Sequence, residues 1–184
     1  AKRGKSAPTV ADDECEFELP QSWQWARFGQ VIHDSEAGWS PSCEGGPRTG
    51  SAWGVLKVSA VSWGEFRPRE NKELPSNLDA RPEFEVQDGD FLISRANTSE
   101  LVARSVIALR PEPRLMMSDK IIRLRLSALV DRQFFNIVNN SRLARIYYAK
   151  NASGTSSSMK NVGREVILHM PVPVPPLAGQ HGIV

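Results

Sequence analysis

Short apolar segments bounded by turn-forming residues recur along most of this sequence and predict a sheet of short strands. Four segments have strand character, at residues 53–61, 91–95, 105–109 and 120–126. Glycine, proline, asparagine and aspartate lie between them, as is typical of strand ends. The turn 87–90, with Gly89, introduces the second of these segments. The pattern therefore favours several short strands over a few long ones.

The segment 120–126 has the clearest period of two. Ile122, Leu124 and Leu126 alternate there with Arg123 and Arg125. Such alternation is typical of a strand whose two faces meet different environments. We therefore expect the Ile and Leu side chains in the core and the guanidinium groups on the other face.

Helical spacing occurs in three places. The segment 131–140 places Phe134, Ile137 and Val138 on one side, and Ser141 is expected to cap a second helix over 142–150. In that second helix the apolar positions are Leu143, Ile146 and Tyr147. A third helix is predicted near the N-terminus, because Ser22 can cap it and Trp25, Phe28 and Ile32 follow at i, i+3 and i+7.

Three stretches lack any such periodicity. Residues 1–18 are polar and charged, which predicts a disordered lead-in. Residues 34–52 are rich in Gly, Ser and Pro and predict a long loop, in which Trp39 is expected to cover the core. Residues 151–160 are small and polar and predict a surface loop. Strands, helices and loops together predict an α+β fold: a twisted, largely antiparallel sheet flanked by two to three helices.

The C-terminal stretch combines an apolar run with four prolines. Val166 to Leu168 predicts a strand, and an alternation of Val and Pro then leads to Pro175 and Pro176. Proline fixes φ and has no N–H, so these residues cannot lie in a central strand. We expect an extended edge or a stiff exit from the fold, followed at Leu177 by the start of a helix.

Composition and charge narrow the class of protein. The 184 residues suit one domain, and no apolar run is long enough for a membrane span or a signal peptide. The two cysteines, Cys15 and Cys43, are expected as free thiols in a cytoplasmic protein. The net charge is only +2, but residues 101–184 hold twelve Lys/Arg against four Asp/Glu, a net charge of +8. This asymmetry favours polyanion binding and ion pairing across the fold about equally.

Catalytic motifs are scarce in this sequence. A methyltransferase would show a Gly-rich cofactor loop and an Asn/Asp-Pro-Pro-Tyr-like tetrapeptide, and neither occurs. The acid–base pair Asp119-Lys120 lacks the carboxylate-then-Glu-x-Lys spacing of a restriction-type nuclease. His33, Cys15 and Cys43 have no zinc-site spacing. We therefore expect no catalysis, no cofactor and no metal.

Several motifs in fixed order resemble the target-recognition domain of type I restriction–modification specificity subunits. The resemblance covers residues 19 to 184. The matching segments are the opening 19–31, the Gly38-x-Ser40-Pro41 turn, the strand 53–60, the Gly89-Asp90 hairpin to Ser94-Arg95, the loop 153–156 before Asn161-Val162, and the closing Pro175-Pro176-Leu177-x-x-Gln180. The order of these motifs, more than any one of them, carries the resemblance.

The resemblance implies a DNA-reading subunit that performs no chemistry itself. It implies duplex DNA, methyltransferase subunits and a restriction subunit as partners, with a second recognition domain or a second copy beside it. It also implies a recognition domain at 19–176 and the start of a spacer helix at 177–184. Gly179 stands where the family usually has Glu, and Gly179 and Gly182 each disfavour a helix by about 1 kcal/mol. The docking role of that helix is therefore the part of the resemblance that this sequence supports least.

Phosphate contacts in DNA complexes come from Lys, Arg and hydroxyl groups, and base contacts come from Arg, Asn, Ser and Thr. The loop after the hairpin strand supplies a guanidinium suited to guanine and an amide suited to adenine. The alternative for each candidate is an ordinary turn, a flexible linker or a solvated helix face. The expected DNA-binding residues are Ser94, Arg95, Asn97, Thr98, Lys120, Arg142, Arg145, Thr155, Ser156 and Lys160.

The basic residues after the first strand lie among acidic ones. Lys57, Arg67 and Lys72 alternate with Glu65 and Glu70, so ion pairing is the favoured interpretation there. Two other functions stay open on the sequence alone. One is a degenerate metal-dependent nuclease that uses Asp119, and the other is a protein-interaction module that docks through the Pro-rich C-terminus.

Overall fold

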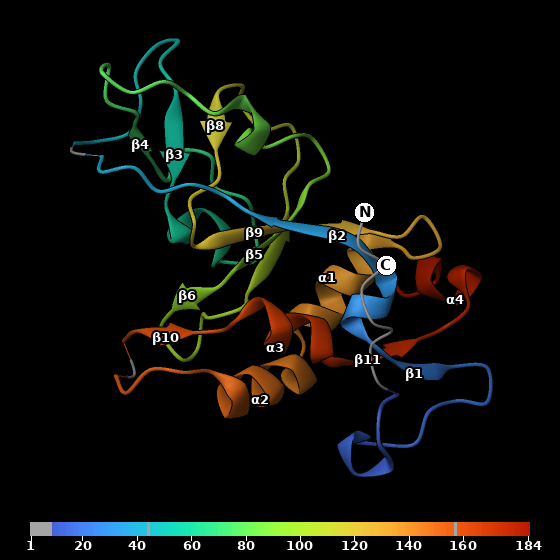
Figure 1. Ribbon diagram of the computed structural model, residues 1–184. Helices are drawn as coiled ribbons and strands as arrows, with labels where there is room; N and C mark the ends of the chain where they lie inside the picture. Colours follow the sequence, from blue (N-terminus) through green and yellow to red (C-terminus); the bar gives the residue numbers. More distant parts are fainter. Residues whose placement is uncertain (1–8, 44, 157) are drawn as a thin grey trace.

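The computed structural model describes residues 9–43, 45–156 and 158–184. A central sheet crosses the molecule, with a smaller sheet above it and the helices mostly below (Figure 1). The strands are β1 (Gln24–Arg27), β2 (Ile32–Ala37), β3 (Gly54–Leu56), β4 (Asn71–Glu73), β5 (Phe91–Ser94), β6 (Ala96–Asn97), β7 (Ser105–Ile107), β8 (Leu115–Met116), β9 (Ile121–Leu126), β10 (Lys160–Asn161) and β11 (Pro171–Val174). The helices are α1 (Arg132–Asn140), α2 (Arg142–Asn151), α3 (Arg164–His169) and α4 (Leu177–His181).

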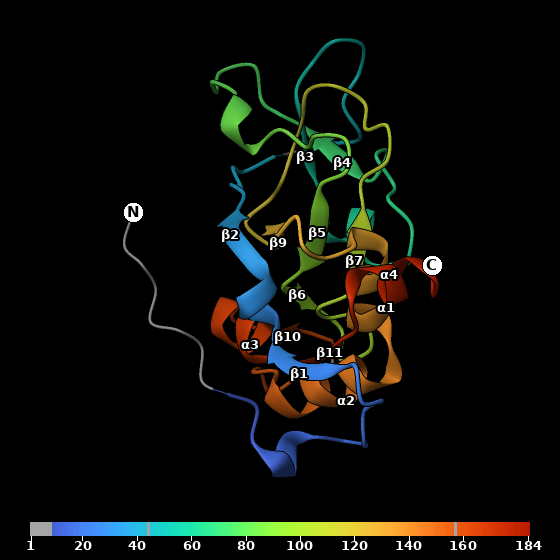
Figure 2. The same ribbon diagram turned by 90° about the vertical axis from the view of Figure 1, so that its right-hand side faces the viewer.

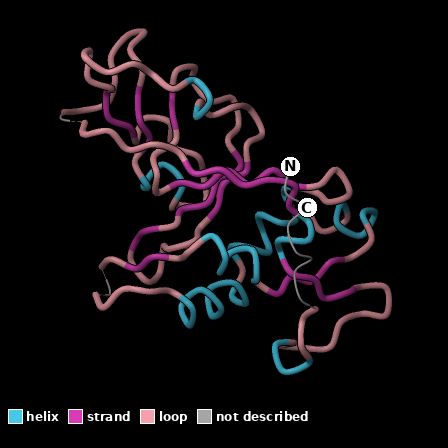
Figure 3. The backbone as a smooth tube through the Cα atoms, in the orientation of Figure 1, coloured by secondary structure: helices cyan, strands magenta, loops and turns pink. Residues whose placement is uncertain are grey.

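The central sheet has the strand order β2-β9-β5-β7, and each neighbouring pair is antiparallel. A second sheet, β4-β3-β8, forms an upper lobe and contains a parallel pair, β3 with β8. Two-stranded pairs, β6 with β10 and β1 with β11, complete the fold. The tube in Figure 3 shows how much of the chain is loop between these short elements. The expected α+β class with short, largely antiparallel strands is confirmed, although the strands form several small sheets.

The strand β9 matches the predicted period of two but not the predicted environment of its second face. Ile122 and Leu124 are buried in the main core cluster, as expected. Arg123 is also buried, with only 3% of its surface exposed, while Arg125 is exposed. Ile121 on the same face as Arg123 packs into a second apolar cluster below the upper lobe. Both faces of β9 are therefore covered, because core clusters lie on each side of the sheet.

The N-terminal helix that the spacing of Trp25, Phe28 and Ile32 predicted does not form. This segment instead runs through β1, a short 3-10 turn at Phe28–Val31, and β2. β1 pairs with β11 and β2 pairs with β9, so partners far along the chain satisfy the backbone groups that a helix would have satisfied locally. β2 also takes up part of the predicted loop 34–52, through Ala37.

The C-terminal stretch differs from its prediction at one end only. Val166 to Leu168 lies in the helix α3, not in a strand. The proline-rich segment that follows is the strand β11, whose single partner is β1, so the expected edge position is confirmed. Its first three residues are buried, so this part of the segment is packed into the fold. The predicted helix start at Leu177 is α4, and Gln180 is buried there with hydrogen bonds to Pro175 and Asp131.

The helices α1 and α2 form where they were predicted, and Asp131 and Ser141 cap them through hydrogen bonds to backbone N–H groups. Their buried faces are shifted from the prediction. Phe135, rather than Ile137, joins Phe134 in the core, and Tyr148 is fully buried while Ile146 is exposed. Figure 2 shows α1 and α2 on the side of the central sheet away from the upper lobe. None of the described helices is long and apolar enough to cross a membrane.

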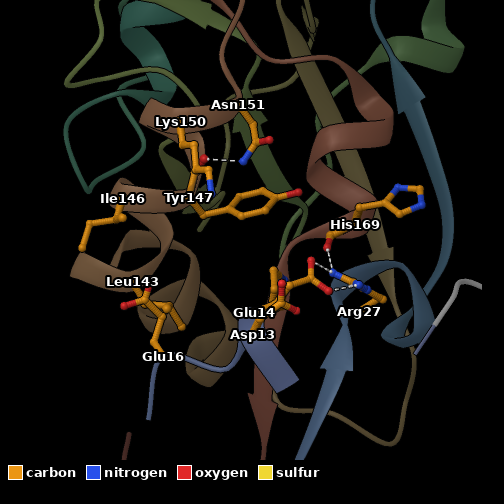
Figure 4. Close-up of a pocket in the computed structure, with 11 residues that line it drawn as sticks. Asp13, Glu14, Glu16, Arg27, Leu143, Ile146, Tyr147, Lys150, Asn151 and His169 are labelled. Carbon is orange, nitrogen blue, oxygen red and sulfur yellow. Dashed lines mark hydrogen bonds and ion pairs between the residues drawn. The ribbon is translucent and has the colours of Figure 1, made fainter. Parts of the chain in front are cut away.

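The segment before β1 is partly ordered, contrary to the predicted lead-in. Residues 1–8 lie outside the described part of the chain, but Asp12–Glu14 forms a 3-10 turn. Glu14 makes an ion pair with Arg27 at the end of β1, and Arg27 also donates to the carbonyl of His169 at 3.0 Å (Figure 4). This contact lines a pocket of about 350 Å³ beside Tyr147 and Lys150 of α2. Cys15 and Cys43 are free thiols, as expected.

Candidate nucleic-acid interface

The loop between β5 and β7 brings three distant segments together. The backbone N–H of Arg95 donates to the carbonyl of Lys120 at 2.8 Å, and the carbonyl of Arg95 accepts from Val162 at 2.8 Å. Beside it β6 pairs with β10, so Asn97 lies opposite Lys160. The backbone segments that carry Arg95, Lys120 and Lys160 therefore lie side by side, at the end of β5 where β6 and β10 lie in Figure 1. We call Arg95, Asn97, Thr98, Lys120 and Lys160 the β6–β10 surface.

The charged groups of this surface have few partners within the fold. Arg95 is half-buried, and its guanidinium makes no hydrogen bond to any residue that the structure describes. Lys120 pairs with Asp119 at 3.1 Å, and the Lys160 ammonium donates to the carbonyl of Gly154 at 2.6 Å. Burial opposes ionisation of Asp119, but hydrogen bonds from Ser40 and Lys120 outweigh it and hold the pKa of Asp119 below its usual range. Lys120 and Arg95 therefore act on a single carboxylate, Asp119, to which Ser40 and Lys120 are already bonded.

Asn97 organises the loop through both ends of its amide. Its Nδ2 donates to the hydroxyl of Ser62 at 2.8 Å, and its Oδ1 accepts from the backbone N–H of Thr98 at 2.8 Å. Each of these amide atoms can make one more hydrogen bond, because an amide offers two donors and two acceptor positions. Asn97 can therefore hold the turn and still present one donor and one acceptor outward.

The loop 151–160 borders this surface but is less tightly held. Ser153 pairs with Asn161 as an isolated bridge, which closes the loop. Thr155 and Ser156 are exposed, and the Ser156 hydroxyl lies 2.7 Å from that of Ser158. These hydroxyl groups can approach a phosphate, whereas Ser157 lies outside the described residues.

The polar groups of two predicted contacts, Ser94 and Arg145, bond to backbone carbonyls within the fold. Ser94 has no exposed surface, and its hydroxyl donates to the carbonyl of Leu101 at 3.1 Å. Arg145 donates to the carbonyls of Val102, Ala103 and Asn139 at distances of 2.6 to 2.9 Å. Arg142 and Arg145 are three positions apart on α2, as predicted, but their side chains have different surroundings. Arg142 is exposed and makes no hydrogen bond or ion pair in the described ranges.

Basic side chains from both halves of the chain form ion pairs within the fold. Arg123 is paired with Glu36 and Asp90, and Arg48 is paired with Glu112. Lys57 pairs with Glu70 and Arg67 with Glu65, which confirms the expected ion pairs after the first strand. Arg95 at the β6–β10 surface and Arg142 on α2 make no ion pair with any acidic residue that the structure describes.

Sequence reasoning missed two exposed apolar side chains near this surface. Trp63 follows Ser62, the partner of Asn97, and 52% of its surface is exposed. Met159 precedes Lys160 and is 65% exposed. Neither has a local signal, because their proximity to Asn97 depends on the pairing of β6 with β10 and on the Ser62 contact. Among the described residues no group of three or more His, Cys, Asp and Glu side chains could hold a metal ion.

Comparisons with known proteins agree with the motif order. No protein-family model matches the sequence. Over all of its length the chain is 38% identical, across 185 aligned residues, to a part of the type I restriction enzyme EcoEI specificity subunit of Escherichia coli. The chain spans 31% of that relative, so it corresponds to about a third of it. The resemblance that the sequence motifs indicated is confirmed.

Solved structures share the fold at lower identity. The HsdS subunit of Thermoanaerobacter tengcongensis superposes with a TM-score of 0.56 and 18% identity, over 91% of this chain and 37% of that one. The S subunit of a type I restriction–modification system from M. genitalium gives a TM-score of 0.57 at 11% identity, over 91% of this chain and 39% of that one. A structure concerned with complex assembly of the type I R-M system gives 0.59 at 18% identity, over 91% and 38%. The α+β arrangement is thus that of part of such subunits.

Proposed function

We propose that this chain is a target-recognition domain of the type I specificity-subunit family and that it reads one half of a bipartite duplex DNA sequence. The observation that carries the proposal is the β6–β10 surface, where backbone pairing places the segments of Arg95, Lys120 and Lys160 beside the segment of Asn97. The 38% identity to a restriction enzyme specificity subunit supports the same function. We propose residues 19–176 as the recognition domain and 177–184 as the beginning of a spacer helix.

Different residues of this surface suit different parts of DNA. Lys120 and Lys160, with the hydroxyls of Thr155 and Ser156, suit phosphate oxygens, and Arg142 on α2 suits a phosphate further along the backbone. The unpaired guanidinium of Arg95 suits the O6 and N7 atoms of guanine, and the outward donor and acceptor of Asn97 suit adenine. Thr98 can supply a further contact. Recognition then requires no chemical step in this chain.

In this proposal the partners perform the chemistry. Methyltransferase subunits, and a restriction subunit with them, would act on DNA that this domain has selected. A second recognition domain, or a second copy of this one, would read the other half of the site. The coverage of about a third of the curated relative leaves room for these additional parts.

Salt-dependent binding by the full specificity subunit, assembled with its partner subunits, tests the proposal. Preferred duplexes are first selected from a random library, and affinities are then measured at several salt concentrations. We expect K160Q to weaken binding to all duplexes and to flatten the salt dependence by about one phosphate contact. R95Q should lower affinity for the selected duplex by about tenfold or more, because one good bidentate base contact is worth about 1–3 kcal/mol.

Arg132 provides a matched control. It bonds to the carbonyl of Gly89, which lies at the opposite end of β5 from Arg95, so R132Q should leave DNA binding unchanged. Absence of duplex binding even at low salt would contradict the proposal. Metal-dependent DNA cleavage that disappears in D119N would instead favour a nuclease. A stable protein complex that ignores nucleic acid would favour an interaction module.

A further inference from the structure

Arg145 of α2 is a partly buried cation that makes no ion pair with any acidic residue in the described part of the chain. Its guanidinium donates to the carbonyls of Val102 at 2.6 Å, Ala103 at 2.9 Å and Asn139 at 2.9 Å. Its Nε is buried without a hydrogen-bond partner among the described residues, and no carboxylate there forms an ion pair with it. Backbone carbonyl dipoles, with the ring of Tyr148, therefore balance this charge. Such an arrangement is costly, since a buried cation is normally paired.

The surroundings of Arg145 add to that cost. Burial and the neighbouring charge of Arg104 together lower the pKa of Arg145 to about 10, so it remains charged at neutral pH. Arg104 itself donates to the carbonyl of Asn140 at 3.3 Å. Two cations thus lie close together beneath the loop between β5 and β7. An apolar side chain would fill this space at lower electrostatic cost, so the hydrogen bonds of Arg145 need a purpose other than bulk stability.

Arg145 binds the last part of the loop that carries Arg95, Asn97 and Thr98, just before β7 begins. Val102 and Ala103, its two acceptors in the loop, are fully buried. Ala103 has a φ of +58°, a left-handed conformation that a non-glycine residue adopts only when its surroundings impose it. The N–H of Val102 donates to the carbonyl of Thr98 at 2.9 Å. Arg145 therefore bonds to Val102, and Val102 in turn bonds to Thr98, one of the residues of the β6–β10 surface.

A second pair of buried side chains holds the same point. Asn139 of α1 donates from Nδ2 to the carbonyl of Ala103 at 2.9 Å, and the hydroxyl of Tyr148 donates to Oδ1 of Asn139 at 2.8 Å. The Arg145 guanidinium lies over the Tyr148 ring, 5.3 Å from its centroid. The junction of α1 and α2 therefore forms a rigid base under the loop. Both polar side chains, Arg145 and Asn139, converge on Ala103.

We propose that Arg145 is a positioning residue that sets the conformation of the base-reading loop 95–104 and thereby the sequence selectivity of the domain. The inference rests on the proposed DNA-reading function and goes beyond it, because it assigns selectivity to a residue that never touches DNA. Arg142 lies one helical turn earlier and is exposed, so in this proposal it contacts a DNA phosphate directly, whereas Arg145 positions the loop. Two arginines three positions apart would thus serve different parts of recognition.

The two arginines predict opposite signatures in one binding experiment. The full specificity subunit in its complex is titrated with a library-selected duplex and with a scrambled duplex, at several salt concentrations. We expect R145Q to weaken binding to the selected duplex by about tenfold or more, with scrambled-duplex affinity and salt slope nearly unchanged. R142Q should weaken both duplexes equally and flatten the salt slope by about one contact. R145K should recover part of the selectivity, since an ammonium can still donate to Val102 and Ala103.

Loss of stability is separated from loss of positioning by two further variants. I167V, a change at the core residue of α3, should lower the melting temperature by a few degrees and leave selectivity intact. Y148F removes only the hydroxyl bond to Asn139 and should give a smaller loss of selectivity than R145Q. Hydrogen exchange at the Val102 amide should become faster in R145Q, because its bond to Thr98 is no longer held from below.

Three outcomes decide the inference. Equal weakening of both duplexes by R145Q, with a flatter salt slope, would show direct phosphate contact and overturn positioning. Unchanged selectivity in a folded R145Q would also overturn it. If the wild-type subunit itself prefers no duplex, the proposed function fails, and this result is distinct from the other two because it precedes any variant.

Discussion

At the scale of single residues, one carboxylate ties the segment before β1 to the domain. Glu14 pairs with Arg27, and this contact and the N–H of Ala11 lower the pKa of Glu14 from 4.5 to about 2. Because the folded pKa lies below the unfolded one, ionised Glu14 stabilises the fold above pH 4.5. That contribution is lost as pH falls from 4.5 toward 2.

The variant E14Q tests this contact. We expect it to melt at a lower temperature than the wild type at pH 7, with the difference shrinking steadily between pH 4.5 and pH 3. Thermal melts followed by circular dichroism measure the difference. E16Q is the control, since Glu16 is exposed in the same segment and makes no hydrogen bond among the described residues. A difference that did not depend on pH would contradict the role of the charge.

The residue scale also shows how far the candidate site was predictable. The residue types of the loop after β5 indicated Arg95, Asn97 and Thr98, and these do lie on an accessible surface. Ser94 and Arg145 carry similar polar groups, but these groups donate hydrogen bonds within the fold. Ser94 donates to the carbonyl of Leu101, and Arg145 donates to that of Val102. Their acceptors are backbone carbonyls, which every residue carries, so no pattern in the sequence marks them. Burial of a polar side chain is set by three-dimensional packing, which residue type alone does not reveal.

At the scale of elements, the end of β2 passes unusually close to the chain after β8. Trp39 donates from its backbone N–H to the carbonyl of Met117 at 3.0 Å. A Cβ added at Gly38 would lie 2.1 Å from that same carbonyl oxygen. Because both partners are backbone, neither can move aside like a flexible side chain.

We therefore expect G38A to lower the free energy of unfolding by about 3 kcal/mol, as overpacking does in a well-filled interior. Urea denaturation measures this loss. G46A is the matched control, because a Cβ there meets nothing within 4 Å and should change stability by less than about 0.5 kcal/mol. Equal stability of the two variants would contradict the close approach of β2 to Met117.

Helices and strands were predicted correctly where the signal lay within a few residues. The predictions were wrong where an element depends on a pairing partner far along the chain. The apolar spacing in 131–140 marked α1, and the expected cap Ser141 marked α2, because both signals act within a few residues. The spacing of Trp25, Phe28 and Ile32 predicted a helix, but β11 supplies a pairing partner about 150 residues away. Prolines predicted an edge strand correctly, since proline limits its own backbone whatever its neighbours do.

At the scale of the whole molecule, Arg123 joins the central sheet to the upper lobe. From β9 it pairs with Glu36 of β2 at 2.6 Å and with Asp90 at 2.9 Å. It also donates to the carbonyls of Glu83 and Glu85, at 2.8 and 2.9 Å. Glu83 lies within the 3-10 turn Pro82–Phe84 and Glu85 directly follows it, and Phe84 of this turn packs against the upper-lobe cluster. One buried guanidinium therefore connects two separate core clusters.

Removing the guanidinium of Arg123 should weaken the contact between the central sheet and the upper lobe more than it weakens the core cluster of either part. We expect R123L to lower the free energy of unfolding by about 3–5 kcal/mol, since Asp90 and Glu36 lose their buried partner. R125L changes the neighbouring exposed arginine, which lies 3.9 Å from Asp34, and should cost less than about 1 kcal/mol. Hydrogen exchange should accelerate first at residues 83–86 and 115–117, while the β5–β9 pair stays protected. If R123L and R125L cost the same, or if all regions lose protection together, Arg123 is not the connection between the lobes.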